Sequence, residues 1–398
     1  MSPLSLVFAA CAFASGFGMR TIDPLILPIA QRFDVTPATA ALLTSAYALP
    51  YALAQPFLGP LGDRFGKVRC IQVCVVMMAV ALVCGAIAPS FETLLASRLL
   101  AGVFAGGLIP LVLAGFGDLY DLQQRQVMVG RLLVAIISGQ MLGSAAAGLV
   151  GDAFGWRGAL ALTATIAVLA SALAWAGAAR TAASPVATRS VASFASLYAH
   201  VFDNRKAYWL YGAVIVEGML VFAPFPYMGQ LLIEHTGSAP ADAPTRAGLV
   251  LAAFGVGGIV YGLMVRRLVA ALGVRRMCAV GSAALAAGTA MFVVLPAWWL
   301  YAAVMAACGM GYYMLHNSLQ IEATELAPSA RGSAVALFAC GFFAGLALGP
   351  PLFGALMHAA GFSAALLTCA LGIALLGRVV VCTVIGTPQA DTPGHQRP

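Results

Sequence analysis

The stretch GMRTIDPLILPIA, residues 18–30, places Arg20, Asp23 and two prolines in a run that is otherwise apolar from Leu4 to Ala30. The run is long enough to cross a bilayer, since a membrane helix needs about 20 apolar residues. An ionisable side chain at membrane depth is expensive and normally faces the protein interior or a water-filled cavity. The two charges therefore need an explanation from the rest of the chain.

The composition indicates an all-α membrane protein. Of 398 residues, 62% are hydrophobic and only 9% are charged, whereas a soluble domain carries about 25% charged residues. The first apolar run lacks the basic start and cleavage site of a secretory signal, so we interpret it as the first membrane span.

Apolar runs predict twelve transmembrane helices, and a Ser/Ala-rich segment divides them into two groups of six. We therefore expect two pseudo-symmetric six-helix bundles at 1–179 and 207–386, a cytoplasmic linker at 180–206 and a cytoplasmic tail at 387–398. The predicted spans are 4–30, 38–59, 70–88, 91–117, 127–150, 158–179, 207–233, 246–265, 277–295, 297–321, 331–357 and 362–386.

Lys and Arg are concentrated in the loops on one side of the predicted spans, which places that side, with both termini, in the cytoplasm. The same bias explains the net charge of +7 without nucleic acid as a partner. The opposite loops hold only Arg32, Arg157 and Arg246. The nine cysteines are scattered along apolar segments, and no His or further Cys completes a metal set around Cys70 and Cys74.

The two halves resemble each other. The turn after the second span, GPLGDRFGKVR at 59–69, has a counterpart after the eighth span, GLMVRRLVAALGVRR at 262–276. Gly130, Gly139, Gly143 and Gly148 form a ladder in the fifth span, and the eleventh span repeats it with Gly341, Gly345, Gly349 and Gly354. Paired bundles suit a transporter with its site between them, and small residues also serve close helix packing.

The turn at 59–69 resembles the hallmark motif of the major facilitator superfamily, and the two groups of six spans extend the resemblance over nearly the whole chain. The matching residues are Gly59, Asp63, Arg64, Gly66, Lys67 and Arg69. The resemblance implies that Asp63 faces the positive, N-terminal end of the eleventh span and latches the two bundles together on the cytoplasmic side. Gly66 would permit a tight turn, and the basic residues would pair with acids of nearby loops.

Two further motifs resemble those of twelve-span drug exporters. Residues 130–148 resemble the antiporter signature through Gly130, Gly139, Gly143 and Gly148, with Ser144 in place of a proline and Ala147 in place of a glycine. Residues 97–107 resemble the Arg-containing motif of the fourth span, through Arg98, Gly102 and Gly106. In exporters that Arg is implicated in proton coupling.

Arg20 and Asp23 are three residues apart and so share one helix face, which we expect to look into the central cavity. Pro24 has no N–H, so the Arg20 carbonyl loses its helical partner and the helix can bend. We expect Asp23 to take up and release a proton under the influence of Arg20. The alternative is a static ion pair that only orients helices.

The remaining candidates are polar or aromatic residues within the predicted spans. Glu217 is the second proton-carrier candidate, or else a hydrogen-bonded neutral acid, and Arg98 pairs with Asp23 or Glu217 or binds an anionic substrate. The alternative for the aromatic residues and His316 is simple packing. We expect the substrate cavity to be lined by Tyr47, Tyr51, Gln55, Gln140, Phe222, Phe225, Tyr227, Tyr312, His316 and Asn317.

The sequence contains no nucleotide-binding loop and no catalytic constellation, so we expect no enzyme activity, metal or cofactor, and transport driven by an ion gradient. The resemblance implies a monomeric proton-coupled antiporter that exports a drug or metabolite across the inner membrane of a bacterium. The alternatives are a proton symporter that imports a small organic acid, and a sensor or scaffold without flux.

Overall fold

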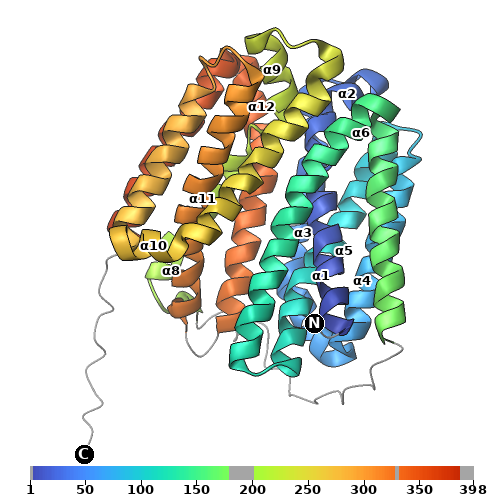
Figure 1. Ribbon diagram of the computed structural model, residues 1–398, viewed down its shortest axis with the longest axis vertical. Coiled ribbons are helices and arrows are strands. Elements are labelled where there is room, and N and C mark those ends of the chain that lie inside the picture. The colour runs from blue at the N-terminus through green and yellow to red at the C-terminus, as the bar shows by residue number, and fades with distance from the viewer. Residues whose placement is uncertain (1–2, 179–200, 328–330, 386–398) are drawn as a thin grey trace, which may run out of the picture.

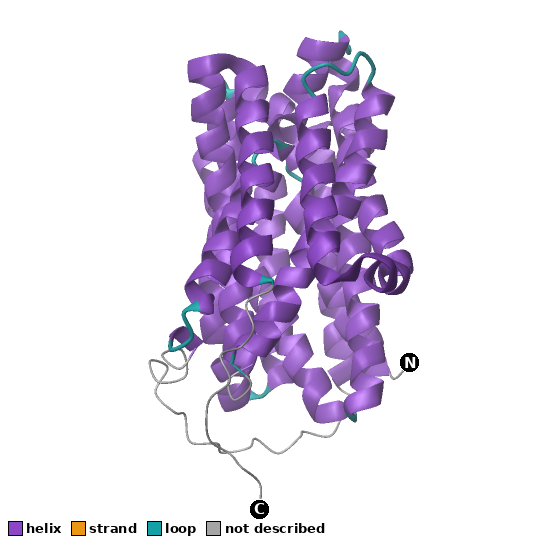
Figure 2. Cartoon of the chain, turned by 90° about the vertical axis from the view of Figure 1, so that its left-hand side faces the viewer, coloured by secondary structure: helices purple, strands orange, loops and turns teal. Residues whose placement is uncertain are grey.

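The structure, a computed structural model, describes residues 3–178, 201–327 and 331–385, and within these ranges the chain forms helices and contains no strand. Most helices run along the long axis of the molecule (Figure 2). The α-helices are α1 Pro3–Arg20, α2 Ile26–Phe33, α3 Pro37–Phe65, α4 Lys67–Ala86, α5 Phe91–Leu119, α6 Leu122–Ala178, α8 Lys206–Phe222, α9 Met228–Thr236, α10 Ala243–Met291, α11 Trp298–Leu326 and α12 Arg331–Val379.

The first span is broken where the sequence predicts a bend. A short 3₁₀ helix, η1 (Asp23–Leu25), separates α1 from α2 and carries Pro24 at its second position. The same break recurs in the second half, where η2 (Phe225–Tyr227) separates α8 from α9 and carries Pro226 at its second position. Proline explains both breaks, because it lacks the N–H that a continuous helix needs and its ring clashes with the preceding turn.

Three of the long helices contain a single non-helical glycine at which the chain turns back (Figure 1). These are Gly155 in α6, Gly273 in α10 and Gly361 in α12, with φ values of 73°, 67° and 85°. Glycine adopts this left-handed backbone without the steric cost that a Cβ atom imposes. Two further 3₁₀ and π segments, η3 (Pro240–Asp242) and η5 (Val380–Val384), flank α10 and α12.

Within the residues that the structure describes, seven helical stretches are long and apolar enough to cross a membrane, as expected of a multi-pass membrane protein. Three of them exceed 50 residues, and each of these contains one of the glycine turns. The stretches are Leu4–Phe33, Lys67–Ala86, Phe91–Leu119, Val127–Gly177, Lys206–Thr236, Pro240–Met291 and Gly332–Val384.

Close helix contacts in the first half recur at equivalent positions in the second. Gly143 of α6 packs against the backbone carbonyl of Phe17 in α1, and Gly349 of α12 packs in the same way against that of Met219 in α8. Gly139 against Phe13 and Gly345 against Ile215 form a second equivalent pair, as do Gly16 against Ile136 and Gly218 against Phe342. In register, the first span therefore corresponds to α8–η2–α9 at a constant separation of 202 residues, as from Asp23 to Phe225.

The contact of α3 with α5 recurs between α10 and α11. Gly102 of α5 packs against the carbonyl of Tyr47, and Gly309 of α11 packs against the carbonyl of Phe254. Phe254 of α10 follows Tyr47 of α3 by 207 residues, and Gly309 of α11 follows Gly102 of α5 by the same number. This register fixes which residue of one half corresponds to which residue of the other.

The halves meet where α6 packs along α10 and α3 packs along α12. Near the end of the molecule that carries α2 and α9 (top in Figure 1), here called the α2–α9 end, the carboxylate of Asp152 accepts a hydrogen bond of 3.1 Å from the backbone N–H of Thr245 in the first turn of α10. Closer to the middle, the Ser45 hydroxyl donates to the carbonyl of Ala347 at 2.6 Å. The two halves are thus in direct contact along this part of the molecule.

Candidate functional site

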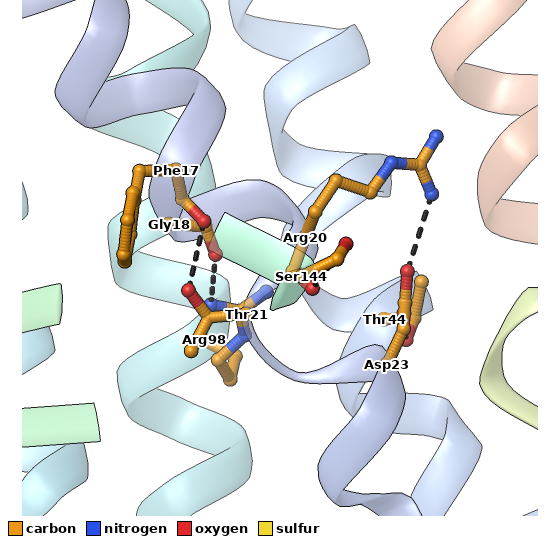
Figure 3. A network of polar contacts seen from close by, with 8 residues as sticks. All are labelled: Phe17, Gly18, Arg20, Thr21, Asp23, Thr44, Arg98 and Ser144. Carbon is orange, nitrogen blue, oxygen red and sulfur yellow. Dashed lines mark hydrogen bonds and ion pairs between the residues drawn. The ribbon is translucent and has the colours of Figure 1, made fainter. Parts of the chain in front are cut away.

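Arg20 and Asp23 form a buried pair at the break in the first span. They do not share one helix face that looks into the cavity, as expected, because Asp23 lies in η1 beyond the end of α1 and only Arg20 lines the cavity between the halves. Nη1 of Arg20, at the end of α1, lies 3.3 Å from Oδ2 of Asp23 at the start of η1. The Thr44 hydroxyl of α3 donates to the other carboxylate oxygen, Oδ1, at 2.7 Å (Figure 3). All three side chains are buried. Both oxygens of Asp23 therefore have partners, and Thr44 is a residue that sequence reasoning did not identify.

The break also frees backbone carbonyls, and buried side chains from other helices donate to them. The Ser144 hydroxyl of α6 donates to the carbonyl of Arg20 over a long 3.4 Å. Nη1 of Arg98, from α5, donates to the carbonyl of Gly18 at 2.9 Å. These carbonyls need partners because the helix stops before their usual N–H donors.

Arg98 forms no ion pair with an acid of the described residues, neither with Asp23 nor with Glu217. Its guanidinium lies 4.3 Å from the ring centre of Tyr47, and its Nε donates to the carbonyl of Leu43 at 3.4 Å. Nη2 is buried and has no hydrogen-bond partner among the described residues. The cation is held by carbonyl dipoles and an aromatic face, contacts that depend on three helices meeting and that spacing in the sequence does not reveal.

Glu217 lies in a second polar site, in the second half. It is fully buried in α8, and its Oε2 lies 2.8 Å from Nδ1 of His316 in α11. Its other oxygen, Oε1, is buried without a hydrogen-bond partner in the described part of the chain. Tyr312 stacks on the imidazole with ring centres 4.9 Å apart. His316, expected to line the substrate cavity, instead holds the buried carboxyl group of Glu217 and is not among the residues that line the cavity between the halves.

A small cavity of about 20 Å³ lies between the halves. Four of the residues expected to face a cavity line it, namely Arg20, Gln140, Phe222 and Phe225. Sequence reasoning did not identify Leu251 and Phe254 of α10 or Tyr313 of α11, which also line it. Leu251 and Phe254 could have been identified from the internal repeat, because they occupy the positions in α10 that correspond to Thr44 and Tyr47 in α3.

The Arg20 guanidinium reaches across the boundary between the halves. It lies 4.3 Å from the ring centre of Phe222 and 5.0 Å from that of Phe225, both in the second half. A guanidinium over an aromatic face is attracted by the ring quadrupole, more strongly where water is excluded. Arg20 therefore connects three things: the acid Asp23, the cavity and the opposite half.

The other residues expected in the cavity lie elsewhere in the core. Tyr47 is beneath Arg98, Tyr51 packs 4.2 Å from the ring centre of Phe343, and Gln55 is buried in α3. The Tyr227 hydroxyl donates to the carbonyl of Pro350 at 2.9 Å, and Asn317 donates to Tyr261 at 2.8 Å. Tyr312 packs on Phe222 with ring centres 5.4 Å apart. Their part in substrate binding stays a prediction.

The motif at 59–69 is described only in part. Gly59 lies within α3, but the side chain of Asp63 is outside what the structure describes, so the expected latch stays a prediction. Gly66 ends α3 with a φ of 91°, which is the tight turn that the sequence predicts. Nζ of Lys67 pairs with Asp118 at 2.6 Å, while Arg64 and Arg69 are exposed.

The glycines of the antiporter-like helix have two different neighbours. Gly139 and Gly143 pack on the backbone of α1, within the same half. Gly148 packs against the carbonyl of Pro244 at the start of α10, in the other half. Within the ranges that the structure describes, no three His, Cys, Asp or Glu side chains gather in a way that could hold a metal ion.

Comparison with known families identifies the class to which this fold and site belong. The family model of the Major Facilitator Superfamily matches residues 8–330 and 210–397. The chain belongs to this superfamily, whose members are membrane transporters rather than enzymes.

Among characterised relatives, similarity is partial. Multidrug resistance protein 2 of Bacillus subtilis is 25% identical over 166 residues, which is 42% of this chain and 41% of that protein. Quinolone resistance protein NorA of Staphylococcus aureus is 27% identical over 154 residues, 37% of this chain and 40% of that protein. The chain thus matches about two fifths of the length of these relatives.

Solved structures share the fold over the full chain. The nucleoside transporter NupG superposes with a TM-score of 0.77 at 14% identity, covering 97% of this chain and 100% of NupG. A D-xylose-proton symporter superposes with a TM-score of 0.74 at 16% identity, covering 96% of this chain and 97% of that one. At this level of identity the likeness concerns the fold alone.

Proposed function

We propose that the protein is a proton-coupled exporter of a small organic molecule, a drug or a metabolite, in the inner membrane of a bacterium. One observation carries the proposal: Arg20 lines the cavity between the halves and also pairs with the buried acid Asp23. A substrate that enters the cavity disturbs Arg20 and thereby the proton affinity of Asp23. That linkage is what coupling to a proton gradient requires.

The proposed architecture has twelve crossings in two six-helix bundles, 1–179 and 207–386, joined by the linker 180–206 and followed by the tail 387–398. Dividing α6, α10 and α12 at their glycine turns and counting α3 and α11 as spans gives this number. The repeated contacts in each half support it. With both termini in the cytoplasm, the α2–α9 end faces outward, and the protein works as a monomer without a bound cofactor.

Alternating access would then consist of separating the halves at one end while they close at the other. The contacts Asp152–Thr245 and Ser45–Ala347 close the α2–α9 end. In this proposal Asp63 and the other residues of the motif at 59–69 act as the latch at the cytoplasmic end.

Export is favoured by the relatives whose names refer to multidrug and quinolone resistance. The glycines of α6 that resemble the antiporter signature are consistent with it. Gly148 lies where α6 meets α10, so this ladder reaches the surface along which the halves would move.

A second candidate, proton-coupled uptake of an organic acid, is favoured by the charge of the cavity. Arg20 is the one charged residue among the residues that line the cavity in the described part of the chain. Protonation of Asp23 removes its negative charge and its pairing with Arg20, which leaves Arg20 to an anion. Binding of the anion and binding of the proton therefore favour each other, and the two would move in the same direction.

Reconstitution into vesicles with an imposed pH gradient separates the two candidates. Candidate substrates and lumenal pH are followed together. Opposed movement of substrate and protons supports export by antiport, and parallel movement supports uptake by symport. Absence of flux with every substrate, in protein that melts cooperatively, argues for a sensor or scaffold and against both.

A further inference from the structure

The two walls of the cavity differ in polarity at positions that the internal repeat makes equivalent. In register, Arg20 corresponds to Phe222, Asp23 to Phe225, Thr44 to Leu251 and Tyr47 to Phe254. Of the first members, Arg20, Asp23 and Thr44 form the charged network around Asp23, whereas Tyr47 packs against Arg98. The second members all line the cavity from the other half and carry no charge. One half thus presents a cation where the other presents rings.

Hydrogen-bond donors gather on the side of the first half. The Arg20 guanidinium has five N–H groups, and within the described ranges one hydrogen bond, to Asp23, accounts for a single donor nitrogen. Gln140 adds an amide from α6. Both oxygens of Asp23 already accept hydrogen bonds, and that residue is not among those that line the cavity. The cavity therefore offers donors and positive charge, with no carboxylate facing it among the described residues.

The opposite wall is aromatic. Phe222 and Phe225 pack edge to face with ring centres 4.9 Å apart, and Phe225 and Phe254 do so at 5.3 Å. The Arg20 guanidinium lies over Phe222 and Phe225 in this state, so a flat ring of a substrate would pack against these rings once the guanidinium has moved away. Tyr313 of α11, which also lines the cavity, adds another ring.

We infer that the transported molecule is an amphipathic organic anion, with its anionic group on Arg20 and its aromatic body against the wall formed by Phe222, Phe225 and Phe254. A carboxylate fits best, because a guanidinium binds its two oxygens through parallel N–H donors. The inference rests on the proposed function, since it assigns the substrate class of that transport site. An anionic substrate is also the case in which the charge of the cavity favours the second candidate, uptake together with a proton.

The cavity as described is too small for such a molecule, which agrees with a state in which the halves are in contact. The lining residues come from both halves, so separation of the halves enlarges the space between Arg20 and the rings. The same separation takes Phe222 and Phe225 away from the guanidinium and leaves it to the substrate.

Equilibrium binding to the purified full-length protein in lipid nanodiscs tests the inference without any proton gradient. The probes are naphthoate, its neutral analogue naphthamide, the cation naphthylmethylammonium, and acetate, which has the charge without the ring. Naphthoate should bind at least about tenfold more tightly than each of the other three. Equal binding of naphthoate and naphthamide, tighter binding of the cation, or no binding of naphthoate to cooperatively melting protein overturns the inference.

Variants locate the charge and the ring contacts separately. Arg20→Gln should reduce the preference for naphthoate over naphthamide to about one, and Arg20→Lys should retain part of it. Phe254→Leu should weaken the binding of naphthoate and of naphthamide by a similar factor of about five, so the preference for naphthoate stays the same. The matched control is Arg267→Gln, which removes an exposed arginine of α10 and should change neither quantity. An unchanged preference in Arg20→Gln contradicts the assignment.

Failure of this inference is distinguishable from failure of the proposed function. Naphthoate binding with the expected preference, but without proton-linked flux in vesicles, would retain the substrate class and reject the coupling. Proton-linked flux of a cationic substrate would retain the coupling and reject the substrate class.

Discussion

Asp23 is the residue through which the proton gradient is proposed to act, and its two hydrogen-bond partners hold it in one position. Asp23→Asn keeps the shape and removes the titrating charge. We expect gradient-driven transport to fall at least about tenfold, because no proton can then be exchanged at this position. Substrate exchange without a gradient should continue. Vesicle flux with and without a pH gradient measures both.

The control for that substitution is Asp34→Asn. Asp34 is exposed and has a left-handed backbone with a φ of 53°, which asparagine tolerates well. It should transport like the unmodified protein. Full gradient-driven transport by Asp23→Asn would remove Asp23 from the coupling mechanism.

The Glu217–His316 pair makes a prediction about stability. His316→Leu leaves a buried carboxyl group without its partner and should cost about 2 kcal/mol. The double variant Glu217→Met/His316→Leu replaces both polar groups and should recover most of that loss. Thermal melting of the purified single and double variants measures the difference, and strictly additive losses would show that the two side chains do not stabilise each other.

The residues of the site were predictable from the sequence only where they are close in the chain. Arg20 and Asp23 are three apart, and Pro24 indicates a freed carbonyl, so spacing and backbone chemistry sufficed. The pairing of Glu217 with His316 joins α8 to α11 and depends on how the helices pack. The hydrogen bond from the Ser144 hydroxyl to the Arg20 carbonyl was not predictable for the same reason. The sequence showed only that Ser144 departs from the exporter pattern.

At the scale of the helix, α8 contains a matched pair of glycines. A Cβ on Gly218 would press on the backbone of α12 at Phe342 and Leu346, whereas a Cβ on Gly212 would meet nothing within 4 Å. We expect Gly218→Ala to destabilise the protein by about 1–3 kcal/mol through overpacking. Gly212→Ala should be neutral or stabilise by up to about 1 kcal/mol, because alanine favours the helix. Melting temperatures of both variants provide the measurement, and equal effects would contradict the close contact.

The long helices and the turns between them were predicted, whereas the second of the two proline breaks was not. Apolar runs gave the long helices and the bend at Pro24, because membrane helices need about 20 apolar residues and proline breaks them. The matching break at Pro226 was not predicted, although Pro226 follows Pro24 by 202 residues, the separation of the repeat in this part of the chain. The turns at Gly155, Gly273 and Gly361 fall in gaps between the predicted spans, at 151–157, 266–276 and 358–361. Only the left-handed backbone of these particular glycines was not predictable, because glycine adopts either hand.

At the scale of the molecule, transport requires the halves to separate at the α2–α9 end. Asp152 and Thr245 meet there across the boundary. A variant with cysteines at both positions, and with the exposed Cys84 and Cys382 replaced by serine, should form a cross-link on oxidation. Transport should then fall to the level of empty vesicles and return when the disulfide is reduced. Substrate flux into vesicles, measured on the same sample before and after reduction, tests both expectations. Undiminished transport by fully cross-linked protein would show that transport does not require the halves to separate at this end.

The stacking of Arg20 on Phe222 bears on the ancestry of the molecule, because the two residues occupy equivalent positions of the repeat. A dimeric forerunner with two identical subunits would set guanidinium against guanidinium at this contact, or ring against ring. The first arrangement is repulsive and the second holds no cation. The stacked pair therefore requires the two copies of the repeat to differ at this position, which a single chain allows and two identical subunits do not.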